Sequence, residues 1–228
     1  MKFFPEDIST YGQEIDNLFY FIFLFVAIAF VISVFVLIYP LIANRAGKNK
    51  KASYITGEKR GHFAWITRAL VLLALSDFVI LFAEHKAWDT VENIPKMEDL
   101  RVGVTGRQWN WIFTYPGPDG KLNTSDDLVV DSLNSELHVP VHSNVVVELR
   151  AIDVLHSFFV PNARLKHDCI PGRMTTKWFN LTRTGRYDIV CAEICGTLHG
   201  NMRNFLRVES RADYDAYVKA LAERSGKK

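Results

Sequence analysis

The segment CAEICGTLHGNM, from Cys191 to Met202, brings two thiols, an imidazole and a thioether close together in the sequence. The whole chain has only 3 cysteines, so two of them in one short segment is a strong concentration. Thiolate, thioether and imidazole form a soft ligand set, which suits copper better than zinc. Zinc sites favour a C-x2-C spacing and have little use for methionine. The C-x3-C-x3-H-x2-M spacing therefore predicts a copper site.

A second imidazole is needed to complete such a site, and His156 is a candidate from a separate segment, DVLHSF. A single histidine beside apolar residues is usually structural, but the downstream cluster favours a metal-binding role here. Cys191 and Cys195 are poorly spaced for a disulfide on a tight loop. Together with His156 and His199, the two thiolates can hold two copper ions, each sulfur bridging both. Since no ligand position is left open for a substrate, such a site suits electron transfer rather than bond-making chemistry.

Two long apolar runs precede the ligand segments. No charged residue occurs between Asp16 and Arg45, and a second run extends from Ala64 to Ala83. Each run is long enough to cross a bilayer, which takes about 20 apolar residues. The residues before the first run are acidic, unlike the basic head of a signal peptide, so this run is interpreted as a retained span. The loop between the runs has one acid, Glu58, and six basic residues: Arg45, Lys48, Lys50, Lys51, Lys59 and Arg60.

A basic loop between two spans marks the cytoplasmic side of a membrane. The two runs therefore predict a transmembrane hairpin with both outer ends, and everything after about Lys86, on the opposite side. The second run contains Arg68 and Asp77, whose spacing places them on opposite faces of a helix. Arg68 is near enough to the cytoplasmic end to snorkel. Asp77 is expected either to face a partner subunit or water, or to be a protonated residue that helps packing; both alternatives require a partner helix.

Beyond Asp99 the pattern changes from helical to alternating. In QWNWIFTY the alternation places Trp109, Trp111, Phe113 and Tyr115 on one face of a strand. Further strand candidates, separated by Pro, Gly and Asn turns, are RVGVT, SELHV, NVVVELRA, HSFFV, TTKWFN, GRYDIV and NFLRVE. Several short strands of this kind predict a two-sheet Greek-key sandwich.

The chain closes with ADYDAYVKALAERS, which predicts a helix. Ser210 and Asp213 form an N-terminal cap for it. One apolar stripe on this helix combines four residues: Tyr214, Tyr217, Val218 and Leu221.

One acidic insertion, YPGPDGKLNTSDDLVVDSLNSE, interrupts the strand pattern. Its acids are spaced more widely than in a D-x-D-x-D-G calcium loop, so calcium binding between Asp119 and Glu136 is the lesser alternative. A solvated hairpin that turns at Pro118-Asp119-Gly120 is favoured. The net charge of +2 argues against a nucleic-acid protein driven by bulk electrostatics. His138 and His142 are expected to be surface or packing residues.

These segments together resemble subunit II of the haem-copper cytochrome c oxidases. The resemblance spans nearly the whole chain, including the N-terminal hairpin. It is carried by four motifs: VTGRQWNW (104–111), DVLHSF (153–158), the K-x-D-x-I-P-G-R run (166–173) and CAEICGTLHGNM (191–202). It implies a two-helix transmembrane hairpin followed by an all-β cupredoxin-like Greek-key sandwich and a C-terminal helix.

The domain organisation expected on this basis has seven parts. The membrane part consists of an outer N-terminal tail (1–17), a first span (18–43), a basic cytoplasmic loop (44–62) and a second span (63–85). The outer part consists of a linker (86–98), the cupredoxin-like domain (99–210) and a C-terminal helix and tail (211–228).

The resemblance also implies roles for individual residues. Cys191 and Cys195 would bridge the dinuclear copper centre called CuA, and His156 and His199 would each cap one copper. Met202 would be a weak ligand. The backbone carbonyl of Glu193 would be another, and the Glu193 side chain would help to bind a magnesium ion shared with subunit I. Trp109 corresponds to the residue at which the electron enters from cytochrome c, and Asp153 to an acidic residue of the docking surface.

The chain departs from the family pattern at two places. The family usually has a glutamate at the mouth of a proton path, a few residues before a Trp; here His62 holds that place before Trp65, and the W-T-x-x-P pattern is missing. His62, Asp77 or a residue of another subunit are the alternatives for this role. Cys169 replaces a small residue in the I-P-G-R loop and is expected to be a buried reduced thiol without a ligand role. The absence of C-x-x-C-H indicates that no haem is attached covalently to this chain.

The resulting expectation is a subunit that accepts electrons from cytochrome c, or from a cytochrome c domain, and passes them to haem in subunit I, where oxygen is reduced. The chain alone would transfer electrons and not reduce oxygen. It would lie in an energy-transducing membrane, such as a bacterial inner membrane, with its copper domain on the outer side and lipid and other membrane subunits around it. The alternatives are the equivalent subunit of a nitric oxide reductase and a membrane-anchored copper chaperone.

Overall fold

The computed structural model describes residues 4–45, 47 and 56–226. The chain divides into two compact units. One is a helical unit, Glu14–Thr90, and the other joins the N-terminal segment up to Gln13 with everything from Val91 onward. Of the basic loop predicted at 44–62, residues 46 and 48–55 lie outside the described residues.

The helical unit consists of α1 (Gly12–Ala43) and α2 (Arg60–Glu92). Both helices are long and apolar enough to cross a membrane, with mean hydropathies of 3.3 and 2.1 in their most apolar windows. Their large apolar side chains are exposed all round, up to 77 % for Phe82. Such surfaces are unfavourable in water and suit a lipid environment. Arg68 and Asp77 are both exposed on α2.

The beginning of α1 and the end of α2 are joined by polar contacts. Thr90 donates a hydrogen bond from its hydroxyl to the Glu14 carboxylate at 3.0 Å. Lys86 Nζ lies 3.6 Å from the same carboxylate. These contacts hold the two ends together, as expected for an antiparallel helical hairpin.

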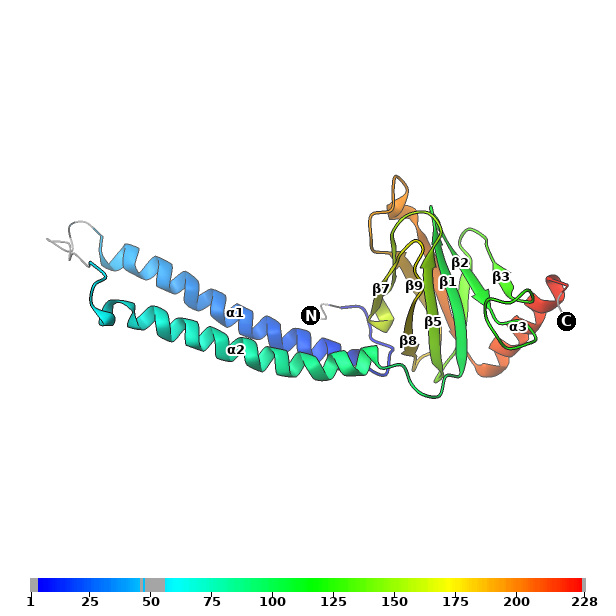
Figure 1. The fold of residues 1–228 in the computed structure, drawn as a ribbon, viewed down its shortest axis with the longest axis horizontal. Coiled ribbons are helices and arrows are strands. Elements are labelled where there is room, and N and C mark those ends of the chain that lie inside the picture. The colour runs from blue at the N-terminus through cyan, green and yellow to red at the C-terminus, as the bar shows by residue number, and fades with distance from the viewer. Residues whose placement is uncertain (1–3, 46, 48–55, 227–228) are drawn as a thin grey trace. The chain divides into compact units, whose positions relative to one another are not determined.

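The second unit is a sandwich of two five-stranded sheets (Figure 1). Sheet 1 has the order β3-β2-β1-β5-β8, and sheet 2 the order β4-β10-β9-β6-β7. The strands of sheet 1 are β1 (Leu100–Arg107), β2 (Asn110–Tyr115), β3 (Leu128–Val130), β5 (Asn144–Ala151) and β8 (Thr175–Asn180). Those of sheet 2 are β4 (Glu136–Pro140), β6 (His156–Val160), β7 (Leu165–Cys169), β9 (Gly185–Cys191) and β10 (Arg203–Glu209). The pairs β1–β5 and β4–β10 are parallel, so the chain crosses between sheets in the Greek-key manner.

The core between the sheets follows the predicted alternation. Trp111, Phe113 and Tyr115 on β2 are completely buried, whereas Trp109 lies just before the strand and is half-buried. Together with the hairpin and the C-terminal helix, this sandwich confirms the predicted fold class. Two strands were not predicted, β3 and β7. β3 is only three residues long, and β7 (LKHDC) is too polar to show the period of a half-buried strand.

The C-terminal helix α3 (Arg211–Arg224) begins as predicted, with Ser210 Oγ accepting a hydrogen bond from the Asp213 amide at 3.2 Å. Tyr217 of α3 stacks on the His138 ring at 3.6 Å between ring centroids. The same histidine places Nδ1 3.0 Å from the Glu209 carboxylate. His138 is therefore a packing residue, as predicted, and His142 is exposed.

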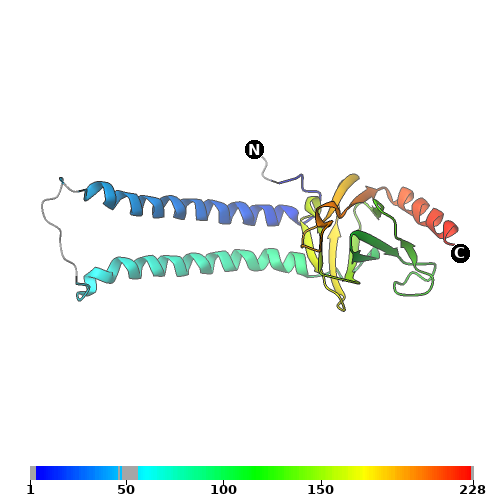
Figure 2. The ribbon, with the colours of Figure 1, turned by 90° about the horizontal axis from the view of Figure 1, so that it is seen from above.

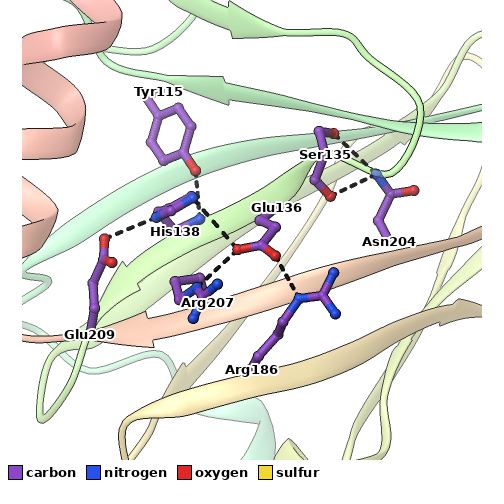
Figure 3. Close-up of polar contacts among 8 residues, drawn as sticks. All are labelled: Tyr115, Ser135, Glu136, His138, Arg186, Asn204, Arg207 and Glu209. Atoms are coloured by element: carbon purple, nitrogen blue, oxygen red, sulfur yellow. Dashed lines mark hydrogen bonds and ion pairs between the residues drawn. The ribbon is translucent and has the colours of Figure 1, made fainter.

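Charged side chains pair across neighbouring strands of sheet 2 beside His138 (Figure 3). Glu136 accepts hydrogen bonds from Arg186 at 2.6 Å and from Arg207 at 2.9 Å. Partial burial raises the pKa of Glu136, but these two bonds outweigh it and hold that pKa below its usual value. This polar cluster lies on β4, β9 and β10 of sheet 2, beside the His138 ring on which Tyr217 of α3 stacks.

The N-terminal segment is not a free tail, because its described residues pack on the sandwich. Ile8 and Tyr11 are buried, at 0 % and 2 % exposure. Ser9 forms a bridge with Leu181, and the Thr182 amide donates to the Ile8 carbonyl at 2.7 Å. Figure 2 shows this segment, dark blue, beside the sandwich. The segment that precedes the first helix thus belongs structurally to the domain that follows the second.

The acidic insertion forms an ordered loop. The Gly120 amide donates to the Gly117 carbonyl at 3.0 Å, which makes the predicted turn around Pro118 and Asp119. Asp126 accepts a hydrogen bond from the Asp119 amide at 3.0 Å. The Asp126 carboxylate thus holds the loop's own backbone by accepting this hydrogen bond.

Candidate metal centre

The two predicted ligand segments meet at one end of sheet 2. His156 is the first residue of β6 and Cys191 the last residue of β9. β6 and β9 pair in antiparallel fashion, with Phe158 opposite Cys191, so the beginning of one strand lies beside the end of the other. The chain then forms a loop and a short helical turn, His199–Asn201, before β10 (orange in Figure 1).

The donor atoms of these segments lie close together. The sulfur atoms of Cys191 and Cys195 are 3.8 Å apart. Cys191 Sγ lies 3.9 Å from His156 Nδ1, and Cys195 Sγ lies 3.6 Å from His199 Nδ1. Each thiol therefore has its own imidazole. Met202 Sδ lies 3.8 Å from Cys195 Sγ, and the Glu193 carbonyl oxygen lies 3.2 Å from Cys191 Sγ.

Burial makes this cluster a plausible metal site and not a surface coincidence. His156 is completely buried, Met202 is 1 % exposed and Cys195 3 % exposed. The ligand atoms of His156, Cys191 and Cys195 all lie within 4.8 Å of one another. Both thiols are free, without a disulfide between them. Buried soft donors that face one another, and not water, fit a copper site well.

The electrostatics of the two thiols differ. Burial raises the pKa of the Cys191 thiol, but hydrogen bonds from His156 and the local backbone outweigh it and lower that pKa below its ordinary value. Burial raises the pKa of Cys195, and the neighbouring Cys191 raises it further. The surroundings of the two thiols thus differ: hydrogen bonds favour ionisation of Cys191, whereas burial and the neighbouring Cys191 disfavour ionisation of Cys195.

Comparisons with known proteins agree with this geometry. The family described as "Cytochrome C oxidase subunit II, periplasmic domain" matches residues 100–208. The alternative cytochrome c oxidase subunit 2 of Bradyrhizobium diazoefficiens is 37 % identical over 164 residues, covering 61 % of this chain and 58 % of that protein. The periplasmic domain of subunit II of cytochrome oxidase from Bradyrhizobium japonicum has 30 % identity and a TM-score of 0.50, covering 58 % of this chain and 99 % of that one.

The sandwich domain of this chain, residues 100–208, belongs to the cytochrome c oxidase subunit II family. Cytochrome c oxidase subunit 2 of Cereibacter sphaeroides is 27 % identical over 245 residues, which cover 94 % of this chain and 78 % of that protein. The alignments span only 58 % and 33 % of the Bradyrhizobium diazoefficiens and Thermostichus vulcanus relatives. The likeness is concentrated in the sandwich that holds the candidate metal centre.

Asp153 lies directly behind His156, one of the candidate ligands. Its Oδ1 is 2.9 Å from His156 Nε2, the ring nitrogen that faces away from the thiols. A carboxylate in this position fixes the ring orientation and leaves Nδ1 free to bind a metal. Partial burial raises the pKa of Asp153, but hydrogen bonds from Gln108 and His156 outweigh it and lower that pKa. Its predicted part in docking stays a prediction, whereas its contact with His156 is a feature that sequence reasoning missed.

The indole of Trp109 lies against the loop that carries Cys195. A Cβ atom on Gly196 would come within 3.2 Å of Trp109 Nε1, and Gly196 has a φ of +123°. Only glycine fits this close approach without strain. Gln108, which precedes Trp109, donates from Nε2 to the Cys195 carbonyl at 2.8 Å. Gln108 stood inside the VTGRQWNW motif, but nothing in its residue type indicated contact with the metal-binding loop.

The remaining predicted residues lie apart from the six donors or are untested. Cys169 is a buried free thiol, as predicted, and burial raises its pKa to about 12; its lack of a ligand role stays a prediction. The Glu193 side chain is half-buried, and magnesium binding by it stays a prediction. The side chain of His62 is outside the described part of the chain. Asp77 lies in the helical unit, exposed on α2.

Proposed function

We propose that this chain is the subunit at which electrons from cytochrome c enter a haem-copper terminal oxidase, on their way to haem in subunit I, where oxygen is reduced. The observation that carries the proposal is the pair of facing thiols, each with its own imidazole. Membership of the sandwich domain in the subunit II family supports it. The chain alone would transfer electrons and leave oxygen chemistry to its partner.

The donor set fits a dinuclear copper centre, CuA. Cys191 and Cys195 would bridge the two ions, with His156 and His199 as terminal ligands. Met202 and the Glu193 carbonyl would be the weaker ligands. When bound, this centre would supply the redox chemistry, taking up and releasing one electron without a change of ligands. The magnesium ion, if shared with subunit I, would be held by the Glu193 carboxylate.

The chain's own residues would keep the site stiff and dry. The Cys191 amide donates to the Met202 carbonyl at 3.1 Å, and the Ala192 amide donates to the Ser157 carbonyl at 3.0 Å. The first bond ties the beginning of the ligand loop to its end, and the second ties its beginning to β6. Met202 and His156 exclude water because they are buried in the sandwich. A fixed ligand geometry lowers the reorganisation that accompanies electron transfer.

Apolar side chains around the centre offer a surface for partner proteins. Ile194 is 82 % exposed, and Leu198, Val154 and Leu155 also expose much of their side chains. Exposed apolar groups that lie this close together are typical of protein interaction sites. We expect cytochrome c to dock near Trp109 and Asp153, and subunit I to cover the Glu193 side of the loop.

The proposed membrane arrangement has two spans and an outer copper domain. The helices α1 and α2 are of spanning length and apolarity. The segment before α1 packs on the sandwich through Ile8 and Tyr11, so both must lie on the same side of the membrane. Two crossings satisfy this requirement and support a hairpin, and the basic residues between the two spans favour the cytoplasmic side for its loop.

The two rival functions are less well supported. A copper chaperone exchanges its metal and would expose its ligands, whereas His156, Cys195 and Met202 are buried. A nitric oxide reductase subunit would share the site, but the relatives described above are oxidase subunits.

The test is electron paramagnetic resonance on the full chain in detergent after copper loading. We expect a multi-line pattern from one unpaired electron shared by two coppers, and its loss in Cys191→Ser. A single-copper spectrum that survives Cys191→Ser would overturn the proposal.

A further inference from the structure

The turn that joins β1 to β2 touches both ligand segments. At one side of it, a Cβ atom on Gly106 would come within 2.9 Å of the His156 ring. At the other side, a Cβ atom on Gly196 would come within 2.9 Å of Gln108 Nε2. The turn thus lies against the histidine of one segment and the loop of the other, although it contributes no ligand atom.

Gln108 makes one hydrogen bond toward each ligand segment. Its backbone amide donates to Asp153 Oδ2 at 2.6 Å, and the other oxygen of that carboxylate lies 2.9 Å from His156 Nε2. Its side-chain amide donates to the Cys195 carbonyl at 2.8 Å. A continuous path of hydrogen bonds therefore runs from the His156 ring through Asp153 and Gln108 to the residue that carries the second thiol.

The loop around Cys195 is held at its two ends by backbone bonds, and within it the His199 amide donates to the Gly196 carbonyl at 3.1 Å, but the Cys195 carbonyl is held by the Gln108 side chain. Its neighbours Ile194 and Gly196 are exposed, and the loop lies outside the ladders of β9 and β10. An irregular loop of this kind keeps its shape through individual hydrogen bonds to its carbonyls. The Gln108 amide is such a bond, and it reaches the loop from a different part of the chain.

We propose that Gln108 is a positioning residue that sets the separation of the two ligand segments, acting through the Cys195 carbonyl on one side and Asp153 on the other. This inference rests on the proposed copper function, but the hydrogen bonds of Gln108 that carry it are present in the metal-free chain. Because Gln108 is itself exposed, water replaces part of the lost bond when the side chain is changed. The expected effect is therefore about two- to tenfold, the range that a single neutral hydrogen bond supports.

The test uses Gln108→Met, which keeps the side-chain length and removes the donor. Its matched control is Asn144→Leu, which removes an amide that donates to the Met97 carbonyl at 3.0 Å. Asn144 lies at the other end of the β1–β5 pair from Gly106. In the copper-loaded full chain, Gln108→Met should speed copper loss to a chelator about two- to tenfold and change the copper hyperfine splitting. Asn144→Leu should leave both unchanged. Identical copper loss and spectra in Gln108→Met and the wild type would overturn the proposal.

A metal-free measurement separates this inference from the copper function. The rate of alkylation of each cysteine is followed by mass spectrometry in the full chain without copper. Gln108→Met should raise the rate at Cys195 about two- to tenfold and leave buried Cys169 unchanged. An equal rise at both thiols would indicate general loosening and would overturn the proposal, as would no rise at Cys195. If the wild type fails to bind two coppers, the proposed function is wrong. The alkylation rates still test the role of Gln108, because they are measured without copper.

Discussion

The sandwich contains two clusters centred on histidines, His138 and His156. They differ in whether their donor atoms are paired within the protein or face one another, where they could bind a ligand. His138 stacks on Tyr217 and points its Nδ1 at Glu209, and the charged groups beside it are paired with one another. His156 uses only Nε2 for such a contact, with Asp153, and turns Nδ1 toward a thiol. The first cluster is satisfied within the protein and stabilises the fold. The second leaves soft donor atoms facing one another, which is the mark of a binding site.

The largest expected effect comes from removing one histidine of each cluster. His156→Ala should weaken copper binding by more than about 100-fold, since even outer-shell partners of a metal ligand cost about 10- to 100-fold in affinity. His138→Ala should leave copper affinity unchanged and lower only stability. Competition titration with a copper chelator measures both. Equal losses in the two variants would remove the distinction between the clusters.

A smaller effect is expected from the carboxylate behind His156. Asp153→Asn keeps the shape but weakens the hold on Nε2, so copper affinity should fall about tenfold. The measurement needs no cytochrome, which separates this role from the predicted docking role. If copper affinity is unchanged and only the KM for cytochrome c rises, Asp153 acts in docking alone.

The smallest effect belongs to the satisfied cluster and depends on pH. The pKa of Glu136 is lowered in the folded chain, so its ion pairs contribute stability above the ordinary pKa of about 4.5, and that contribution is lost as pH falls through the folded value. Glu136→Gln should therefore reduce the free energy of unfolding by up to about 1 kcal/mol at pH 7 and by less at pH 3. Denaturant unfolding followed by tryptophan fluorescence tests this. A difference between variant and wild type that is the same at both pH values would contradict it.

The two clusters also differ in how far the sequence predicts them. The clustering of the candidate copper donors could be predicted because soft ligands are rare and their spacing is short, whereas copper binding itself stays a prediction. The buried face of β2 followed from strict alternation of aromatic residues. The bond from Gln108 to the Cys195 carbonyl could not be predicted, because it joins residues far apart in the sequence at a close approach to Gly196. The contact of Asp153 with His156 is local, but it depends on the turn that the chain makes just before β6.

The packing of the N-terminal segment likewise could not be predicted from the local sequence pattern. Ile8 and Tyr11 are ordinary apolar residues in a short stretch that has no period of its own. They are buried where Ser9, which lies between them, forms a bridge with Leu181, a residue far away in the sequence. Local patterns reveal strands and spans, whereas contacts between distant segments need the fold.

The most direct test of the central claim is the copper content of the purified full chain after gel filtration in the presence of a mild chelator. Two buried thiols with an imidazole each should retain two copper ions per chain, with neither cysteine available to alkylation. One copper or fewer per chain, or a disulfide between Cys191 and Cys195 in the active complex, would contradict the account.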